Sequence, residues 1–154
     1  MASPPASALP PPTSARLSAA LAQEIVAAAR AALPNESVGL LVGRHGAPER
    51  YVAMANAAAS PYRYAIDPEH QLRVWTALED AGESVLAIVH SHVASVASPS
   101  RTDIELAYFP ESLYLICSLA DPERPAIRAW SIRDGAATEI PMAVTEVETR
   151  RQPA

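Results

Sequence analysis

The sequence predicts an α+β domain in which helices flank a mixed, mainly antiparallel β-sheet. Two stretches carry apolar residues at helical spacing, and several short apolar runs lie between glycine- or proline-containing turns, as strands do. The element order, α-β-β-β-α-β-α-β-β-β, places strands next to one another as well as between helices, which favours this fold class. The chain has 154 residues, enough for one domain with a hydrophobic core.

The first helix is expected between Ser14, a good helix-capping residue, and Pro34, which ends helices. Between them, apolar residues recur every three or four positions and form one face: Leu17, Leu21, Ile25, Ala28 and Ala32. The apolar run Gly39–Gly43 and the segment Arg50–Asn56 are then expected to pair as a hairpin around the turn at His45–Pro48.

A second helix is expected to begin at Asp67-Pro68, where a carboxylate caps the first turn and proline fits the first helical position. It follows a short extended segment, Tyr62–Ile66, and is expected to end near Gly82. Its inward-facing residues are expected to be Leu72, Trp75 and Leu78.

The second half of the chain predicts four strands and one short helix. The helix is expected at Asp103–Tyr108, and Asp134-Gly135 predicts a hairpin turn between the last two strands. Leu113–Leu119 is apolar at nearly every position, so it is expected to be a central strand buried on both faces. The four strands are expected at Val85–His90, Leu113–Leu119, Ala126–Ile132 and Thr138–Val144.

Composition narrows the class of protein. The net charge of -5 and the pI of about 5.3 argue against a nucleic-acid partner or an anionic membrane. The lone cysteine, Cys117, excludes an intramolecular disulfide and suits a reducing compartment; in an apolar strand it is expected to be a small core residue.

The two ends of the chain differ in composition from the rest. Residues 1–13 are rich in proline, alanine and serine and are expected to be disordered, and they lack the basic n-region of a signal peptide. No apolar run approaches the roughly 20 residues that span a bilayer. We therefore expect a cytoplasmic protein with one folded domain at residues 14–145 and a polar tail at residues 146–154.

His90 and His92 are spaced so that both face one way at the end of a strand. Asp103 follows where a helix start can turn a carboxylate back toward them. Two imidazoles and one carboxylate leave zinc a coordination position for water, as catalytic zinc sites do. His90, His92 and Asp103 are therefore candidate ligands of one zinc ion.

A hydrolytic zinc site also needs a general base and a group that stabilises the oxyanion. Glu36 is placed to be the base if the strand at Gly39–Gly43 lies beside the one ending at His90, and Ser100 is the candidate for the oxyanion. The spacing alone leaves an alternative open: two strand-end histidines followed by an ordinary helix cap, because Ser100 and Asp103 also have capping-box spacing.

These five residues, in this order and spacing, resemble the complete motif of the JAMM (MPN-plus) zinc metalloproteases. The flanking segments Glu36–Gly43 and Pro99–Ile104 resemble the family's strand after its glutamate and its loop end, and the resemblance covers roughly residues 15–145. It implies a cytidine-deaminase-like JAMM architecture with a domain at residues 14–145. It further implies the ligands His90, His92 and Asp103 for one Zn²⁺ per chain, the general base Glu36, and oxyanion support from Ser100.

The family cleaves the amide after the C-terminal glycine of ubiquitin or a ubiquitin-like protein. Asn56, Tyr64 and the Leu72–Trp75 helix resemble an actinobacterial branch that hydrolyses a sulfur-carrier-protein–cysteine adduct and thereby serves cysteine biosynthesis. The partner that the resemblance implies is a ubiquitin-like sulfur carrier ending in Gly-Gly. Two positions depart from the family pattern. Val38 replaces a common cysteine beside the base, which leaves the chemistry intact, and Val93 replaces a common threonine after the second histidine, which puts the exact substrate in question.

Two other functions stay open at this stage. One is a general isopeptidase that acts on another ubiquitin-like conjugate, and the other is a non-catalytic MPN scaffold, although such scaffolds typically lose metal ligands. A homodimer is compatible with the sequence. Arg63 and Arg101 flank the predicted cleft; solvated surface arginines are the favoured interpretation, and a grip on a substrate carboxylate is the alternative.

Overall fold

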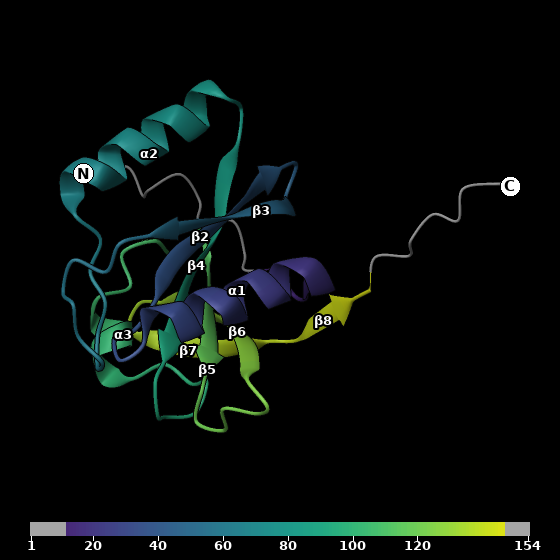
Figure 1. Ribbon diagram of the computed structural model, residues 1–154. Helices are drawn as coiled ribbons and strands as arrows, with labels where there is room; N and C mark the ends of the chain where they lie inside the picture. The colour runs from purple at the N-terminus through teal and green to yellow at the C-terminus, as the bar shows by residue number, and fades with distance from the viewer. Residues whose placement is uncertain (1–11, 147–154) are drawn as a thin grey trace, which may run out of the picture.

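The computed structural model describes residues 12–146 of the chain, which contain eight strands and three helices joined by loops (Figure 1). The strands are β1 (Ala15–Ser18), β2 (Val38–Arg44), β3 (Ala47–Met54), β4 (Ser84–His92), β5 (Leu113–Ser118), β6 (Ala126–Arg133), β7 (Ala136–Ile140) and β8 (Met142–Thr145). The helices are α1 (Ala19–Ala32), α2 (Pro68–Asp80) and α3 (Arg101–Glu105).

A six-stranded sheet in the order β3-β2-β4-β5-β6-β7 organises the fold, and β1 and β8 form a separate two-stranded sheet. Within the large sheet every pair is antiparallel except β4 and β5, which run parallel because the chain crosses over through α3 between them. The predicted α+β class, with a mixed and mainly antiparallel sheet flanked by helices, is confirmed. Strand β4 lies inside the sheet, so its far end is held from both sides.

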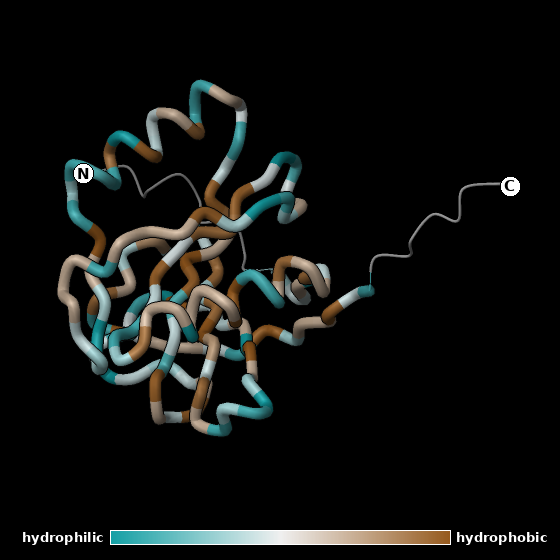
Figure 2. Tube along the Cα trace, viewed as in Figure 1, coloured by the Kyte–Doolittle hydropathy of each residue, from teal (hydrophilic) through white to brown (hydrophobic). Residues whose placement is uncertain are grey.

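Each face of the sheet has its own core. Helix α1 packs Leu21, Ile25 and Ala29 on one face, against side chains that include Val89 and Leu115. Helix α2 packs on the other face, with Leu78 buried and Trp75 partly buried. In Figure 2 hydrophobic residues follow the central strands and the turns are largely hydrophilic. Strand β5 contributes to both cores, which confirms the prediction of a doubly buried central strand.

Local signals predicted several elements correctly. The β2–β3 hairpin is present, and the Asp67 side chain accepts a hydrogen bond from His70 N at 3.0 Å and so caps α2. Asp134 and Gly135 form the β6–β7 turn with φ of 51° and 74°, as a tight hairpin turn requires.

The prediction that Ser14 caps the first helix is wrong. Ser18 is the cap, and its side chain accepts a hydrogen bond from Leu21 N at 3.1 Å. The preceding residues form β1, which pairs in parallel with β8. That pairing joins segments near the two ends of the described chain, so the local periodicity of the sequence could not predict it. Leu17 is nevertheless buried, as predicted.

Four other predictions need correction. Tyr62–Ile66 is an irregular loop rather than a strand. The segment predicted as one strand at Thr138–Val144 is divided into β7 and β8 at Pro141, which lacks the N–H needed to continue a ladder. Leu72 is 69% exposed, because it lies outside the face of α2 that packs on the sheet. The short helix also begins and ends earlier than predicted, at Arg101 and Glu105.

The ends of the chain lie outside these findings. Residues 1–11 and 147–154 are outside the described part, so the predicted disorder of the N-terminus and the predicted polar tail stay predictions. Within residues 12–146, no helix is both long and apolar enough to cross a membrane.

Candidate metal centre

His90 and His92 end the central strand β4 and project from the same face of the sheet. Their ring centroids are 5.2 Å apart, and both rings are buried. Ser91 lies between them, and its Oγ accepts a hydrogen bond of 2.7 Å from Ser37 N. That bond ties the end of β4 to the chain that enters β2.

Asp103 joins the histidines from α3. Its Oδ2 is 2.9 Å from Nε2 of His92 and 3.2 Å from Nε2 of His90. Oδ2 also accepts a hydrogen bond from Ser100 N at 2.9 Å, while the Ser100 Oγ accepts one from Asp103 N at 3.0 Å. This reciprocal pair is a capping box. The cap and the histidine cluster, which the sequence offers as alternatives, are therefore parts of one arrangement.

The donor set fits a metal ion. Neither ring nitrogen of His90 has a hydrogen-bond partner among residues 12–146, although Nε2 is 3.2 Å from a carboxylate oxygen. Two ligand atoms of tetrahedral zinc are about 3.3 Å apart, given bond lengths near 2.0–2.1 Å. His90 Nε2 and the Asp103 oxygen have this separation without forming a hydrogen bond, as expected if both atoms bind the same metal ion.

His92 is oriented for the same point. Its Nδ1 lies 2.7 Å from the carbonyl oxygen of Val96, and its Nε2 faces Asp103. A hydrogen bond from the second ring nitrogen to a carbonyl fixes the tautomer and angle of a metal-binding histidine.

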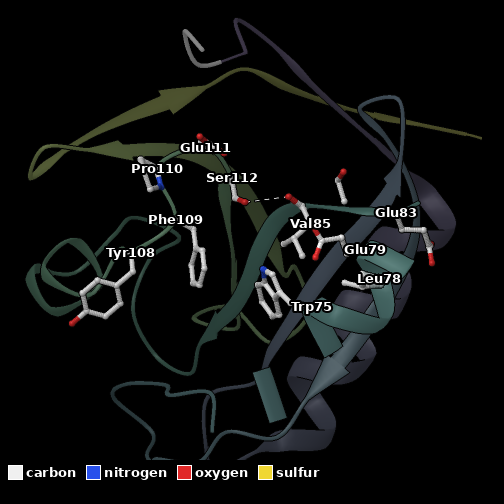
Figure 3. A pocket seen from close by; sticks show the side chains of 11 residues that line it. Trp75, Leu78, Glu79, Glu83, Val85, Tyr108, Phe109, Pro110, Glu111 and Ser112 are labelled. Atoms are coloured by element: carbon white, nitrogen blue, oxygen red, sulfur yellow. Dashed lines mark hydrogen bonds between the residues drawn. The ribbon is translucent and has the colours of Figure 1, made fainter. Parts of the chain in front are cut away.

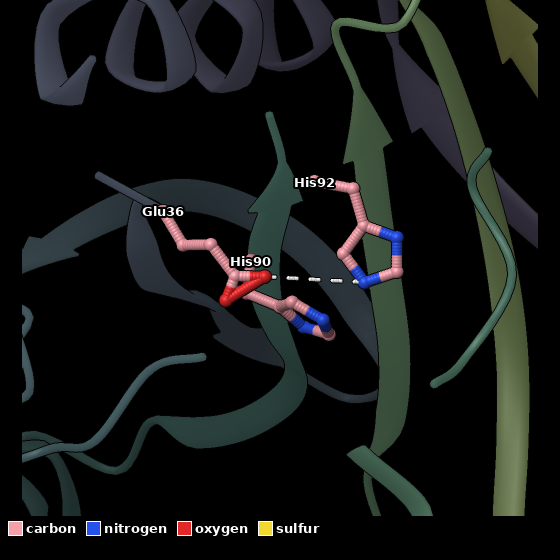
Figure 4. A group of neighbouring side chains, drawn as sticks. All are labelled: Glu36, His90 and His92. Carbon is pink, nitrogen blue, oxygen red and sulfur yellow. Dashed lines mark ion pairs between the residues drawn. The ribbon is translucent and has the colours of Figure 1, made fainter. Parts of the chain in front are cut away.

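Glu36 lies two residues before the start of β2, whose first residue, Val38, pairs with His90. The side chain is 2% exposed, Oε1 is 4.0 Å from His92 Nε2, and Oε2 has no hydrogen-bond partner in the described chain. Figure 4 shows the carboxylate turned toward the two imidazoles. The sequence made Glu36 a candidate base on one condition, that the strand after it lies beside the strand ending at His90. Strand β2 does pair with β4, so this condition is met.

Two ligand sets are geometrically available. Glu36, His90 and His92 can bring one ligand atom each within 4.8 Å of one another. Asp103 is closer to both histidines than Glu36 is to His92, so the set that contains Asp103 is the tighter one.

Burial and mutual charge set the protonation of these groups. Burial, and secondarily the charge of Asp103, raises the pKa of Glu36 to about 7, against a lowering by His92. Burial alone would raise the pKa of Asp103, but contacts with His90 and His92 and the Ser100 N–H hold that pKa far below its usual range. Burial lowers the pKa of His90. Burial acts the same way on His92, but its bonds to Asp103 and Val96 raise that pKa overall.

The other residues that the sequence singles out differ in their burial and contacts. Cys117 is fully buried in the α1-side core, and burial raises its thiol pKa to about 11, as suits a core residue. Arg63 is exposed, and Arg101 is also exposed and pairs with Glu105 at 2.9 Å. Val38 is buried beside His90, and Val93 is half-buried after His92.

A hollow of about 570 Å³ lies between α2 and residues 108–112, at the opposite end of β4 from the histidines (Figure 3). Trp75 and Phe109 stack in its wall, with ring centroids 5.5 Å apart. Its titratable lining groups are Glu79, Glu83, Tyr108 and Glu111, without a histidine or a cysteine. The hollow therefore lacks the metal-binding donor set of the buried cluster, and the cluster is the candidate site.

The comparisons with known proteins agree with this geometry. Residues 18–133 match the family model described as prokaryotic homologs of the JAB domain, and the chain belongs to this family. The resemblance to the JAMM (MPN-plus) proteins is confirmed.

Particular relatives narrow the position within the family. The chain is 46% identical over 128 residues to the CysO-cysteine peptidase of Mycobacterium tuberculosis, covering 82% of this chain and 88% of that protein. It is 40% identical over 88 residues to a desampylase of Haloferax volcanii, covering 55% and 63%.

Two solved structures share the fold. A solution structure of a protein from Desulfitobacterium hafniense matches with a TM-score of 0.77 and 34% identity, covering 88% of this chain and 96% of that one. A JAB1/MPN domain protein from Archaeoglobus fulgidus matches with a TM-score of 0.55 and 21% identity, covering 84% and 99%.

The raised pKa of Glu36 predicts how stability depends on pH in the metal-free protein. Because the folded state holds this proton up to about pH 7 and the unfolded chain releases it near 4.5, the unfolding free energy falls as pH rises between these values. Relative to Glu36→Gln, wild type should lose about 2 kcal/mol between pH 5 and 8. Urea denaturation in chelator at each pH measures this, and a pH-independent difference would contradict it.

Proposed function

We propose that this protein is a zinc-dependent metallopeptidase that hydrolyses the amide after the C-terminal glycine of a ubiquitin-like sulfur carrier and releases cysteine from a carrier–cysteine adduct. The observation that carries the proposal is the convergence of Asp103 Oδ2 on both histidine Nε2 atoms, with the Glu36 carboxylate beside them. Similarity to the CysO-cysteine peptidase over most of both chains supports the cysteine adduct as substrate. The buried, lone Cys117 suits the cytoplasm.

Three residues hold the zinc in this proposal: His90, His92 and Asp103. Their atoms are the tighter of the two available sets, and that choice leaves Glu36 free for proton transfer. Bound zinc supplies Lewis acidity toward the glycine carbonyl and a water that ionises near neutral pH.

Glu36 is the general base. Its carboxylate takes a proton from the attacking water as the glycine carbonyl carbon is attacked, and the protonated acid then passes that proton to the leaving amine. A pKa near 7 suits both halves of this role, because efficient proton transfer needs a group poised near the operating pH.

Ser100 stabilises the oxyanion. Its Oγ accepts the hydrogen bond from Asp103 N, so the hydroxyl hydrogen is free to point at a substrate oxygen. Ser100 is exposed, whereas the metal-binding side chains beneath it are buried. The hydroxyl thus stands at the entrance of the centre.

The burial of the centre favours a slender substrate end. Glu36, His90, His92 and Asp103 are each 5% exposed or less. Two glycines in an extended conformation suit such a buried point better than bulkier residues, because they bring no side chain that must be accommodated. An extended carrier tail would also gain main-chain hydrogen bonds beside the sheet.

A second candidate is cleavage of a lysine isopeptide in a conjugate of another ubiquitin-like protein. The 40% identity to a desampylase favours it. The two candidates share the same residues and chemistry and differ only in the leaving amine.

Glu36→Gln should abolish turnover of a Gly-Gly carrier–cysteine adduct, with kcat falling at least about 100-fold, because the variant cannot accept the water's proton. A chelator should abolish cleavage by the wild-type protein, and added Zn²⁺ should restore that activity. Mass spectrometry of the carrier after incubation measures the released cysteine, and a carrier–lysine isopeptide tested in parallel separates the two candidates. Full cleavage by Glu36→Gln would refute the mechanism; no cleavage by zinc-loaded wild type would favour a non-catalytic scaffold.

Ser100→Ala should lower kcat by about 100-fold through loss of the oxyanion donor, and also lower stability by about 1 kcal/mol through loss of the cap. Ser18→Ala is the matched control, because Ser18 caps α1 through the same kind of bond and lies away from the centre. It should cost similar stability and leave kcat unchanged. Equal kcat in the two variants would show that Ser100 only caps the helix.

A further inference from the structure

The loop Asn56–Ile66, between β3 and α2, is built around the side chain of Asn56. Its Nδ2 donates to the carbonyl oxygens of Glu36 and Arg63, each at 3.1 Å, and its Oδ1 accepts from Ala58 N and Ala65 N, each at 3.0 Å. An amide side chain has two donor hydrogens and two acceptor lone pairs, so all of its capacity is used.

The same loop holds the backbone of Glu36 from both sides. Glu36 N donates to the carbonyl oxygen of Ser60 at 2.9 Å, and Glu36 O accepts from Asn56. The Glu36 carboxylate itself has little to anchor it, since Oε2 has no hydrogen-bond partner within residues 12–146. Its position therefore depends on the backbone from which it projects.

The loop also reaches His90. The ring of Tyr64 lies against the His90 ring, with centroids 4.6 Å apart and planes tilted by 32°. A metal-binding histidine is normally oriented by a hydrogen bond from its second ring nitrogen. His92 has that bond, to Val96, but Nδ1 of His90 has no such partner in the described chain. The face of Tyr64 is the orienting contact that His90 does have.

The conformation of the loop is imposed rather than intrinsic. Ala59 has a φ of 43°, in the left-handed region that a β-carbon disfavours. Such a residue persists only where surrounding bonds over-determine it. The bonds to Asn56, one of which joins Ala59 N to Asn56 O at 3.1 Å, do so here.

We propose that Asn56–Ile66 acts as a clamp that sets the base and one metal ligand relative to each other: Asn56 positions Glu36, and Tyr64 positions the His90 ring. Both are positioning residues, and neither touches the substrate or the metal. The inference rests on the proposed function, because it assigns the clamp to the same centre. The clamp adds Asn56 and Tyr64 to that centre, and the effect of Asn56 on catalysis can be measured separately from the effect of Tyr64 on metal binding.

Tyr64 is tested through the metal. Tyr64→Leu should weaken zinc binding about tenfold, as loss of an outer contact to a ligand does, and should alter the visible absorption of the cobalt-substituted protein. Tyr64→Phe keeps the ring and should match wild type in both. Competition with a chromophoric chelator measures the affinity, and Tyr64→Met is the second variant if Tyr64→Leu does not fold.

Asn56 is tested through catalysis. Asn56→Asp keeps the oxygen that accepts from Ala58 N and Ala65 N. It replaces the amide donor with a carboxylate oxygen that repels the carbonyl oxygens of Glu36 and Arg63, so Glu36 should lose its tether while the bonds to Ala58 and Ala65 remain. We expect kcat on the carrier–cysteine adduct to fall about tenfold or more, with KM and zinc affinity unchanged. Ser112→Ala, which removes the Oγ that donates to the carbonyl oxygen of Val85 at 3.1 Å near the opposite end of β4 from the histidines, is the control and should behave as wild type.

The outcomes separate the two hypotheses. If wild type neither binds zinc nor cleaves the adduct, the proposed function fails. If wild type does both and Tyr64→Leu and Asn56→Asp behave like Ser112→Ala, the clamp is refuted while the function stands. Parallel losses of zinc affinity and kcat in both variants, in proportion to lost thermal stability, would also refute it, because they would show a merely structural role.

Discussion

One carboxylate oxygen, Oδ2 of Asp103, holds the centre together. It accepts a hydrogen bond from Ser100 N and lies within 3.2 Å of Nε2 in both His90 and His92. A helix start and a strand end are thereby fixed to one another by a single atom. Without its partners this charge would be too costly to bury, since an isolated ionised carboxylate in a protein interior costs several kcal/mol. The hydrogen bond from Ser100 N and the two histidines together offset the cost of burying the Asp103 carboxylate.

Around that oxygen the fold supplies rigidity from elements far apart in sequence. Strand β4 is paired on both sides, and Ser91 bonds across to Ser37, which brings Glu36 within 4.0 Å of His92. The result is a buried acid whose pKa is raised to about 7 next to another whose pKa is held far below its usual range. Neighbouring carboxyls with such different proton affinities are suited to different roles, one as a base and the other as a permanent anion.

The sequence predicted the fold class, because strand periodicity and capping signals are local properties. The family resemblance, and not spacing alone, singled out Glu36, His90, His92, Ser100 and Asp103, and the fold brings these residues together. The sequence did not predict β1, because the pairing of Ala15–Ser18 with Met142–Thr145 depends on contacts across the whole chain. The sequence also predicted no role for Asn56 or Tyr64, although both residues are part of the family resemblance. Their contacts, of the Asn56 amide with the Glu36 carbonyl and of the Tyr64 ring with His90, are formed only in the folded protein. In the sequence the capping box at Ser100 is an alternative to a metal site, but in the folded protein the two share the carboxylate of Asp103.

The central claim is that Asp103, and not Glu36, completes the ligand set with His90 and His92. Zinc affinity of Asp103→Asn and Glu36→Gln, measured by competition with a chelator of known affinity, tests it most directly, because asparagine can still accept the bond from Ser100 N and so preserve the cap. We predict that Asp103→Asn weakens zinc binding by on the order of 100-fold and that Glu36→Gln leaves it close to wild type. The reverse order of affinities would contradict the account, since Glu36 would then be a ligand and could not serve as the free base.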